Sequence, residues 1–418
     1  MKVCIGLILL VSFSPTFTLK AQRCDAFVGG YIPSWHDPSI IDYSGLSHTF
    51  YAFAATNNTG DLIVDNPAAV GAFKIASDGT QRFLSLAGGG GAASYTSMTA
   101  SSISIASFVT NCISFCKSNN FQGIDVDWEG IVTAADSAKY GRLMRALSAG
   151  LHSNDLQLVA TIGYGSYGGD FYNVGALNQA DWIQVMVYDQ TGTWSESPFG
   201  NHASFQHVLN AIGYWTGRGY SDVSKMVIGL PFYGYKFNSY SGGLATAMTY
   251  SEIVGKYPAM ACDQDQVGLI VFNGPETIRK KVQYVKQKGL KGVMIWEMSQ
   301  DLVSTDNKSL MKAISLANCD QEAACFQTVT DVETETRLED IVEITNPVDK
   351  FMKISFHEYG GKATALELID TMGRSLFKRD LSNSEPLEID LSQQAAGLFY
   401  LKVSFADDKR VVKKILKL

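Results

Sequence analysis

Positive charge is not in excess in this sequence. Its 418 residues include 34 Lys and Arg against 41 Asp and Glu, which gives a net charge of −7. No basic surface is therefore available to neutralise the phosphates of a nucleic acid. After the first segment, no stretch approaches the roughly 18 apolar residues that a membrane-spanning helix needs. We expect neither a nucleic-acid partner nor a membrane span in the mature protein.

Histidine is scarce, and its six copies are scattered. None of them forms a pair at metal-ligand spacing. His202 and His207 come nearest to one, and we expect both in loops or at the surface. We therefore predict no metal and no other cofactor.

Four segments of different character divide the chain. Residues 1–22 contain a short apolar run after a lysine, which is typical of a secretory signal peptide. Residues 23–318 alternate short apolar runs with amphipathic stretches, whereas residues 319–341 are acidic and aperiodic and indicate a linker. Residues 342–418 carry short alternating strands. We therefore expect two folded domains of different classes.

Secretion permits disulfides, and six cysteines remain after the leader. Cys112 and Cys116 lie in one helical stretch, where we expect small buried hydrophobic residues and no bridge. Cys319 and Cys325 would close a short loop, and we favour this pair as a disulfide. The other pairings stay open.

The second segment has the pattern of an α/β barrel, with strand-like runs followed by helix-like stretches. The expected strands are Phe27–Ile32, Thr49–Ala54, Arg82–Ala87, Gly123–Glu129, Leu156–Ile162, Trp182–Tyr188, Met226–Pro231 and Gly292–Glu297. Eight repeats in about 290 residues fit a closed (β/α)8 TIM barrel better than an open sheet. Ser104–Lys117 is one expected helix, and its apolar face is Ile105, Phe108, Val109, Cys112 and Cys116.

The last segment predicts a small all-β sandwich, because its short strands are separated by turn signals. The expected strands are Met352–His357, Ala365–Asp370, Leu387–Leu391, Phe399–Phe405 and Val411–Leu416.

One barrel strand carries acidic residues at alternate positions. Asp125, Asp127 and Glu129 share one face of it, and the opposite face is apolar. In a barrel the acidic face points inward, near the C-terminal mouth where active sites of this fold lie. Crowding of like charges and burial raise at least one pKa, which makes a proton donor. A solvated or ion-paired strand edge is the alternative, and the apolar opposite face argues against it.

Residues 121–130 resemble the signature of glycoside hydrolase family 18, the chitinases and endo-β-N-acetylglucosaminidases, which reads D-G-x-D-x-D-x-E. Gln122 stands where the family usually has its first Asp, far from the substrate, so we expect it to tune activity. Six more strings resemble other strands of the family in the right order: Val28-Gly29-Gly30-Tyr31, His48–Phe53, Ser85–Gly89, Met186–Asp189 with Gly192 and Trp194, Gly229–Gly234 and Val293–Glu297.

The resemblance implies a retaining hydrolysis in which the substrate replaces the enzyme nucleophile. Glu129 would protonate the glycosidic oxygen and later activate water. Asp127 would orient the substrate acetamide, and Asp125 would modulate the charge of Asp127. Tyr188 would donate a hydrogen bond to the acetamide oxygen.

The resemblance also implies substrate-binding residues, namely Trp296, Met186, Asp189, Trp194, Tyr31 and Ser85. Trp296 would form the floor under the sugar at the cleavage site, and Trp194 a platform beyond the scissile bond. Core packing is the alternative for both tryptophans. Asp189 would bond the distorted sugar. Tyr31 and Ser85 would surround the inner carboxylates, with a purely structural role as the alternative.

Many family members carry an α+β domain between the seventh and eighth strands. Here Gly234–Lys291 is short, and an expected helix at Pro275–Lys288 uses part of it. We therefore do not expect the full insert, and we infer a shallower, more open cleft with endo-acting cleavage.

The tail resembles a C-terminal sorting domain of the type IX secretion system. The similar strings are Asn346-Pro347, Leu368–Arg374 and Ala396–Val403, followed by a basic end. The resemblance implies the secretion machinery as a partner and passage across an outer membrane. A carbohydrate-binding β-module is the alternative, but no tryptophan follows Trp296.

These patterns predict a secreted or cell-surface, monomeric, chitinase-type hydrolase that acts on a polysaccharide or glycan containing N-acetylglucosamine. An endo-β-N-acetylglucosaminidase acting on the chitobiose core of N-glycans shares the same catalytic strand and stays open. A non-catalytic chitin-binding lectin is the third possibility. Such lectins typically lose the acid, and Glu129 is present.

Overall fold

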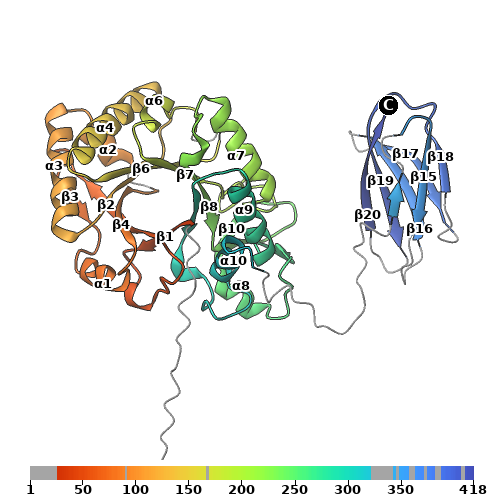
Figure 1. The fold of residues 1–418 in the computed structure, drawn as a ribbon, viewed down its shortest axis with the longest axis horizontal. Helices are drawn as coiled ribbons and strands as arrows, with labels where there is room; N and C mark the ends of the chain where they lie inside the picture. Colours follow the sequence, from red (N-terminus) through yellow and green to blue (C-terminus); the bar gives the residue numbers. More distant parts are fainter. Residues whose placement is uncertain are drawn as a thin grey trace, which may run out of the picture. The chain divides into compact units, whose positions relative to one another are not determined.

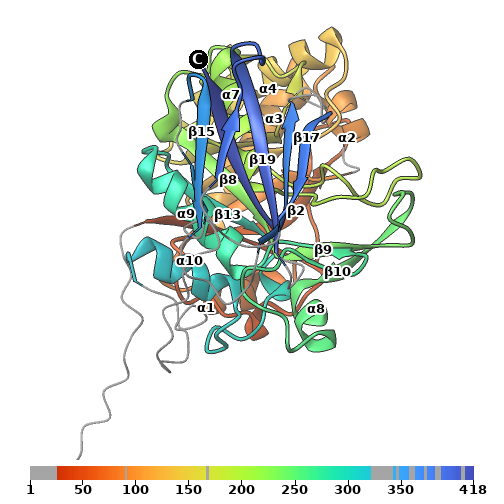
Figure 2. The same ribbon diagram turned by 90° about the vertical axis from the view of Figure 1, so that its right-hand side faces the viewer.

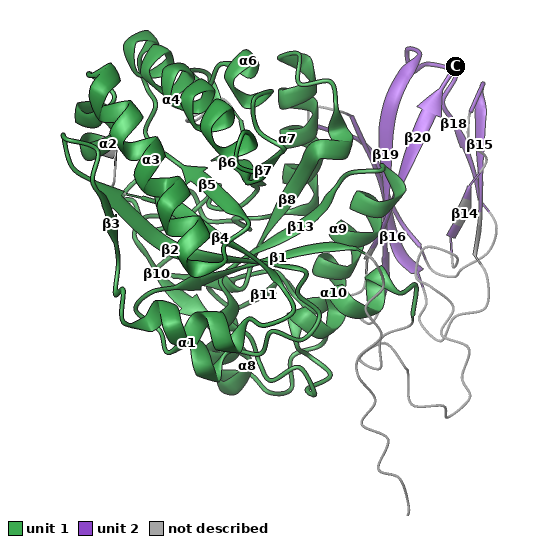
Figure 3. Ribbon diagram, turned by 60° about the vertical axis from the view of Figure 1, so that its left-hand side comes forward, with its two compact units in different colours: residues 1–328 green, residues 329–418 purple. Residues whose placement is uncertain are grey.

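The chain divides into two compact units, residues 1–328 and 329–418 (Figure 3). A computed structural model describes residues 26–89, 92–165, 169–321, 342–344, 348–356, 363–370, 374–381, 387–405 and 410–418. The expected leader and most of the expected linker lie outside the described residues. Among the described residues, no helix is long and apolar enough to cross a membrane.

Unit 1 contains a closed ring of parallel strands. They are β1 (Phe27–Pro33), β2 (His48–Thr56), β4 (Gln81–Ala87), β5 (Gly123–Asp127), β6 (Gln157–Gly163), β7 (Trp182–Met186), β8 (Met226–Pro231) and β13 (Gly292–Trp296). Their order is β1-β13-β8-β7-β6-β5-β4-β2, and β2 pairs with β1 to close the ring. A short strand, β3 (Leu62–Val64), adds antiparallel to β2. The predicted barrel and all of its predicted strands are confirmed.

Helices surround the ring of strands (Figure 1). They are α1 (Ala69–Ala76), α2 (Ala92–Met98), α3 (Ser102–Asn119), α4 (Ala134–His152), α6 (Val174–Leu177), α7 (Phe205–Gly217), α9 (Pro275–Gln287) and α10 (Leu310–Asn318), with 3-10 turns η1 (Pro38–Ile40), η2 (Val223–Lys225) and η3 (Met298–Gln300). The predicted apolar face of α3 is buried throughout. Its two cysteines, Cys112 and Cys116, are free and buried, as predicted.

Two of the other four cysteines form disulfides, but the structure does not test which cysteines pair. Cys262 and Cys319 are disulfide-bonded. Cys24 and Cys325 lie outside the described residues. The bridge between Cys319 and Cys325 therefore stays a prediction.

The segment between β8 and β13 folds into a compact α+β insert, which the sequence analysis did not expect. Its strands are β9 (Tyr233–Phe237), β10 (Ala245–Thr249), β11 (Gln266–Val267) and β12 (Ile270–Val271), in the order β10-β9-β12-β11. Helix α8 (Tyr250–Lys256) lies beside β9 and β10 (Figure 2). The prediction excluded only the full insert, and this fold was not recognised because strands of two to five residues are too short to show a period in the sequence.

Unit 2 is built from two antiparallel sheets around one apolar core. Its strands are β14 (Val342–Ile344), β15 (Phe351–Phe356), β16 (Ala363–Asp370), β17 (Ser375–Asp380), β18 (Leu387–Asp390), β19 (Gly397–Phe405) and β20 (Arg410–Lys417). The sheets have the orders β14-β15-β18 and β17-β16-β19-β20. The predicted all-β class is confirmed, and β14 and β17 are additional strands. His357, the predicted end of one strand, lies outside the described residues.

Candidate active site

The three acidic residues lie at the C-terminal end of β5. Asp125 and Asp127 are buried on the strand, and Glu129 lies just beyond it, partly buried. On the opposite face, Trp128 packs against Tyr95 of α2 and Tyr140 of α4. The strand therefore presents its apolar face to the helices and its acidic face to the interior. It ends two residues before the predicted end, because its ladders with β4 and β6 stop there.

Asp125 is held by three hydroxyl groups from three different strands. Its Oδ2 accepts from Tyr31 Oη and Ser85 Oγ, each at 2.7 Å, and its Oδ1 accepts from Thr161 Oγ1 at 2.7 Å. Gln184 Nε2, on β7, donates to Tyr31 Oη at 2.9 Å and so helps to hold the Tyr31 hydroxyl group in place. Burial raises the pKa of Asp125, and the hydroxyl donors oppose that rise. Thr161 was not predicted, although it lies on an inward-facing position of β6.

No hydroxyl group of the described residues donates to the carboxyl groups of Asp127 and Glu129 as three do to Asp125. Asp127 Oδ1 is buried without a hydrogen-bond partner among the described residues. Burial, followed by the charges of Glu129 and Asp125, raises the pKa of Asp127 well above its usual range. Burial, followed by the charge of Asp189, raises the pKa of Glu129. Neighbouring desolvated carboxyl groups cannot all ionise readily, so the cluster holds a proton that it can donate.

Glu129 opens into a cavity of about 550 Å³, a size that suits a small ligand. Met186, Tyr188 and Asp189 line the cavity beside it. The loops after β5 and β6 supply a mostly apolar wall that includes Ile131, Val132, Tyr164, Phe171 and Tyr172. The structure therefore brings four of the predicted site residues together at one cavity.

Tyr188 is buried next to this cavity, and its Oη lies 4.0 Å from Met294 Sδ. Gly229 makes room for it, because a Cβ at that position would lie 2.8 Å from the Tyr188 ring. Burial, followed by the charge of Asp127, raises the pKa of Tyr188 far above 10.0. The hydroxyl group therefore keeps its proton and can serve as a donor.

Asp189 is held by groups that the sequence analysis did not identify. Its Oδ1 accepts from Tyr233 Oη at 2.6 Å and Tyr235 Oη at 2.8 Å, and His202 Nδ1 lies 3.4 Å from it. Burial alone would raise the pKa of Asp189, but the bonds from His202, Tyr233 and Tyr235 outweigh it and lower that pKa. Asp189 is therefore an anion facing the cavity.

The two histidines expected in loops or at the surface are both buried. His202 is 0% exposed, and His207, on α7, is 2% exposed. His202 lies in a loop, as predicted, although it is buried there, whereas the prediction for His207 was wrong because this residue is buried on a helix. The insert and α9 contact the loop of His202. Lys281 of α9, for example, donates to Ala203 O at 2.6 Å.

The two predicted tryptophans differ in their surroundings. The Trp296 ring stacks on Phe53 with 5.7 Å between ring centroids and lies 5.6 Å from the Tyr31 ring. Exposed Trp35 lies 6.5 Å from Trp296 on its other side. Trp194 is 43% exposed on the loop after β7 and is not among the residues that line the cavity at Glu129. Trp296 thus lies among aromatic rings at the C-terminal end of β13, and like Trp194 it is not among the residues that line the cavity at Glu129.

Gln122 lies at the opposite end of β5 from Glu129. Its Oε1 accepts from the Arg82 backbone N–H at 2.8 Å. The amide thus ties the start of β5 to β4, remote from the acidic cluster.

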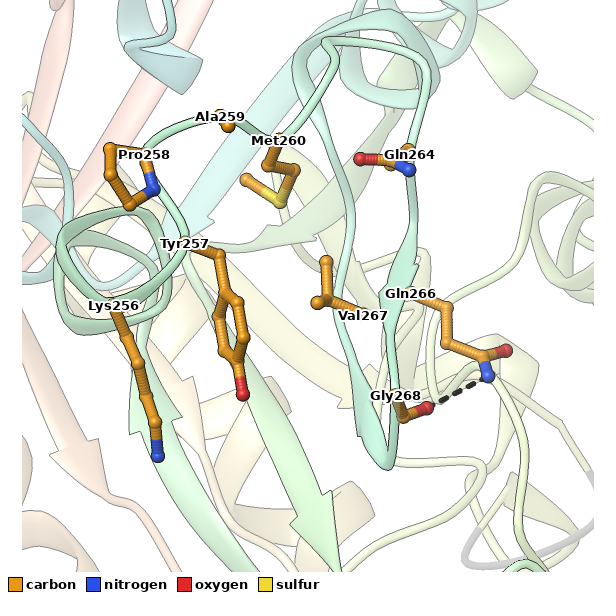
Figure 4. A pocket seen from close by; sticks show the side chains of 9 residues that line it. All are labelled: Lys256, Tyr257, Pro258, Ala259, Met260, Gln264, Gln266, Val267 and Gly268. Carbon is orange, nitrogen blue, oxygen red and sulfur yellow. Dashed lines mark hydrogen bonds between the residues drawn. The ribbon is translucent and has the colours of Figure 1, made fainter.

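A second cavity, of about 520 Å³, lies on the insert (Figure 4). Tyr257 and Val267 face each other across it, with Gln264 and Gln266 at its rim. It has no carboxylate and none of the predicted site residues, so we do not assign the chemistry to it. Within the described ranges, no group of three or more His, Cys, Asp or Glu side chains is arranged to hold a metal ion.

Comparison with known proteins agrees with this geometry. The family model described as glycosyl hydrolases family 18 matches residues 28–301, and a secretion system C-terminal sorting domain matches residues 345–417. The chain belongs to glycosyl hydrolase family 18 and ends in a sorting domain of that type.

The similar proteins include chitinases and an agglutinin. A class V chitinase of Arabidopsis thaliana is 28% identical over 78% of this chain and 98% of its own length. The GH18 chitinase ChiB from the chitin utilization locus of Flavobacterium johnsoniae is 30% identical, with a TM-score of 0.61 over 71% of this chain and 94% of that chain. The chitinase-like agglutinin RobpsCRA of Robinia pseudoacacia is 25% identical, with a TM-score of 0.59 over 69% and 98% of the two chains.

Proposed function

We propose that this protein is a secreted glycoside hydrolase that cleaves β-1,4 linkages next to N-acetylglucosamine in chitin or chitooligosaccharides. The observation that carries the proposal is the row of three carboxyl groups that ends in Glu129 at an open cavity. The names of the chitinase relatives support the substrate class.

In this reaction Glu129 gives its proton to the glycosidic oxygen, and the leaving sugar departs as an alcohol. The substrate's acetamide oxygen attacks the anomeric carbon and forms an oxazolinium-like intermediate, so the enzyme needs no nucleophile of its own. Glu129, now ionised, removes a proton from water as that water opens the intermediate. The anomeric configuration is retained, and Glu129 is protonated again.

The surroundings of each residue support its proposed role. Asp127 Oδ1, which is buried and has no hydrogen-bond partner among the described residues, is assigned to accept the acetamide N–H, which fixes the internal nucleophile in place. The Tyr188 hydroxyl, which keeps its proton, donates to the acetamide oxygen. Asp189 carries a charge that raises the pKa of Glu129 and so retains the proton needed for the first step. A positioned acid contributes about 10²–10⁴-fold to such a rate.

We assign the remaining predicted residues to binding and support. Trp296 is assigned as the floor under the sugar, and Met186 lines the cavity at Glu129. Tyr31 and Ser85 act through Asp125, to which both donate. Trp194 remains a candidate platform for a more distant sugar.

The tail directs the enzyme to the type IX secretion machinery and to the outside of the cell. We propose residues 23–318 as the hydrolase domain, 319–341 as the linker and 342–418 as the sorting domain. The match of the sorting-domain model to residues 345–417 supports this division.

The test is incubation of the purified protein with chitin oligosaccharides and, separately, with a high-mannose glycoprotein, with the products identified by mass. The proposal predicts short N-acetylglucosamine oligomers from the first substrate only. Cleavage of the glycoprotein alone would instead establish an endo-β-N-acetylglucosaminidase. Binding of chitin oligosaccharides without cleavage would establish a lectin.

A further inference from the structure

The Asp189 carboxylate is held from one side only. Tyr233, Tyr235 and His202 all meet its Oδ1, and no hydrogen bond between described residues uses its Oδ2. The Asp189 side chain is 47% exposed although His202 beside it is fully buried. One oxygen is therefore anchored to the protein, and the other is left to the cavity that Glu129 also lines.

His202 lies at the centre of this anchor. Its ring packs against the rings of Tyr233 and Tyr235 in a triangle, with 5.0 Å from its centroid to each of them and 5.7 Å between the two tyrosines. Its Nδ1 lies 3.4 Å from Asp189 Oδ1 and 3.5 Å from the Asp189 backbone nitrogen, whose N–H points to it, and its Nε2 lies 3.3 Å from the Tyr233 carbonyl oxygen. The backbone N–H of Gln190 also donates to the His202 carbonyl oxygen at 3.0 Å. Moving His202 would therefore release both tyrosines and the loop that carries Asp189.

The residues on either side of His202 are held by α9 and by the end of the insert. Lys281 Nζ donates to the carbonyl oxygen of the next residue, Ala203, at 2.6 Å and to Asn273 Oδ1 at 2.7 Å. Asn201 Nδ2 donates to the Phe272 carbonyl oxygen at 3.2 Å. The segment around His202 is thus tied to the end of the insert and to α9, away from the substrate.

We propose that His202 is a positioning residue that, with Tyr235 of the insert, fixes the Asp189 carboxylate opposite Glu129. The inference rests on the proposed function and adds to it a group that never touches the sugar. It also gives the insert a role in the reaction, because Tyr235 lies on β9.

Two substitutions of His202 separate positioning from packing. In His202→Asn, the side-chain amide lies near the place of Nδ1 and can still bond to Asp189, either by donating to its carboxylate or by accepting its backbone N–H. In His202→Gln, the amide lies near the place of Nε2 and cannot. Loss of a hydrogen bond to a charged group predicts that His202→Gln lowers kcat/KM on chitin oligosaccharides about tenfold to a hundredfold, and that His202→Asn restores most of it.

A double-mutant cycle with Asp189→Ala tests whether His202 acts through Asp189. We expect His202→Gln to have no further effect, within about twofold, when Asp189 is already absent. An equal loss in both backgrounds would overturn the inference. His207→Gln is the matched control: it alters a buried histidine that has no hydrogen bond to Asp189, and its effects should be additive with those of Asp189→Ala.

Crystal structures of the variants give a result that does not depend on activity. We expect Asp189 to leave the tyrosine hydroxyls in His202→Gln and to remain there in His202→Asn. If His202→Gln does not fold, Tyr235→Phe removes only one hydroxyl and should release the carboxylate in part. An unmoved Asp189 in an active His202→Gln would refute the positioning role. If the wild type cleaves no substrate and Asp189 is nevertheless displaced in His202→Gln, the proposed function is refuted and the positioning of Asp189 by His202 stands.

Discussion

Asp127→Asn should stabilise the barrel while it impairs the reaction. Asp127 is buried between two other acidic residues, and its Oδ1 has no hydrogen-bond partner among the described residues. Burial and the charges of Glu129 and Asp125 raise its pKa in the folded protein. The native state therefore binds this proton more tightly than the unfolded state does. Stability then falls as the pH rises through the range between the unfolded and folded pKa values.

The expected gain in stability follows from the burial of Asp127 Oδ1 without a hydrogen-bond partner among the described residues. A buried polar group without a partner destabilises a fold by about 1–3 kcal/mol, and a charged one by more. An amide at this position carries no charge and can donate to a neighbouring carboxylate. We expect Asp127→Asn to raise the free energy of unfolding at pH 7 by about 1–3 kcal/mol, which for a domain of this size is about 2–6 °C in Tm.

Tryptophan fluorescence during thermal unfolding is a suitable assay, because all six tryptophans lie in unit 1. The stability difference between Asp127→Asn and the wild type should narrow as the pH falls toward about 4, where the wild-type carboxyl group is protonated in the folded state and about half protonated in the unfolded state. Asp78→Asn, which changes an exposed acid, is the control and should leave Tm unchanged. A Tm for Asp127→Asn equal to or below that of the wild type at pH 7 would refute the reasoning.

Three further predictions concern the pH dependence, the sugar floor and the tail. Asp189→Asn removes the charge that raises the pKa of Glu129, so the alkaline limb of the kcat/KM profile should move to lower pH; an unmoved limb would contradict the assignment. Trp296→Ala should raise KM for chitin oligosaccharides about tenfold, measured by initial rates. A change in kcat alone would contradict the role of Trp296 as the floor under the sugar. Removal of residues 342–418 should leave hydrolysis and the fluorescence transition unchanged, because units 1 and 2 have separate cores, and loss of the transition would contradict the domain division.

The features that could be predicted from the sequence are those that produce a regular spacing of apolar residues. The barrel strands are short apolar runs at regular spacing, and alternation along β5 was enough to place Asp125 and Asp127 on one face and Trp128 on the other. Ser85 and Tyr31 were predicted from the resemblance to family 18, and the structure shows both donating to Asp125. Thr161 could have been found by the same alternation on β6.

The rest of the site depends on contacts between distant segments. Tyr235 reaches Asp189 from an insert whose strands are too short to be recognised by their period. His202 is buried only because this insert and α9 close over its loop. Neither a residue type nor a spacing in the sequence carries this information, so these partners emerged only from the tertiary structure.

Glu129→Gln tests the central claim most directly. The amide keeps the shape of the side chain but cannot donate the carboxyl proton, so hydrolysis of a chitin oligosaccharide should fall by about 10²-fold or more while its binding stays within a few-fold of wild type. Rates from product mass and affinity from calorimetry on the same preparation give both quantities. Retention of more than about a tenth of the wild-type rate would contradict the assignment of Glu129 as the proton donor.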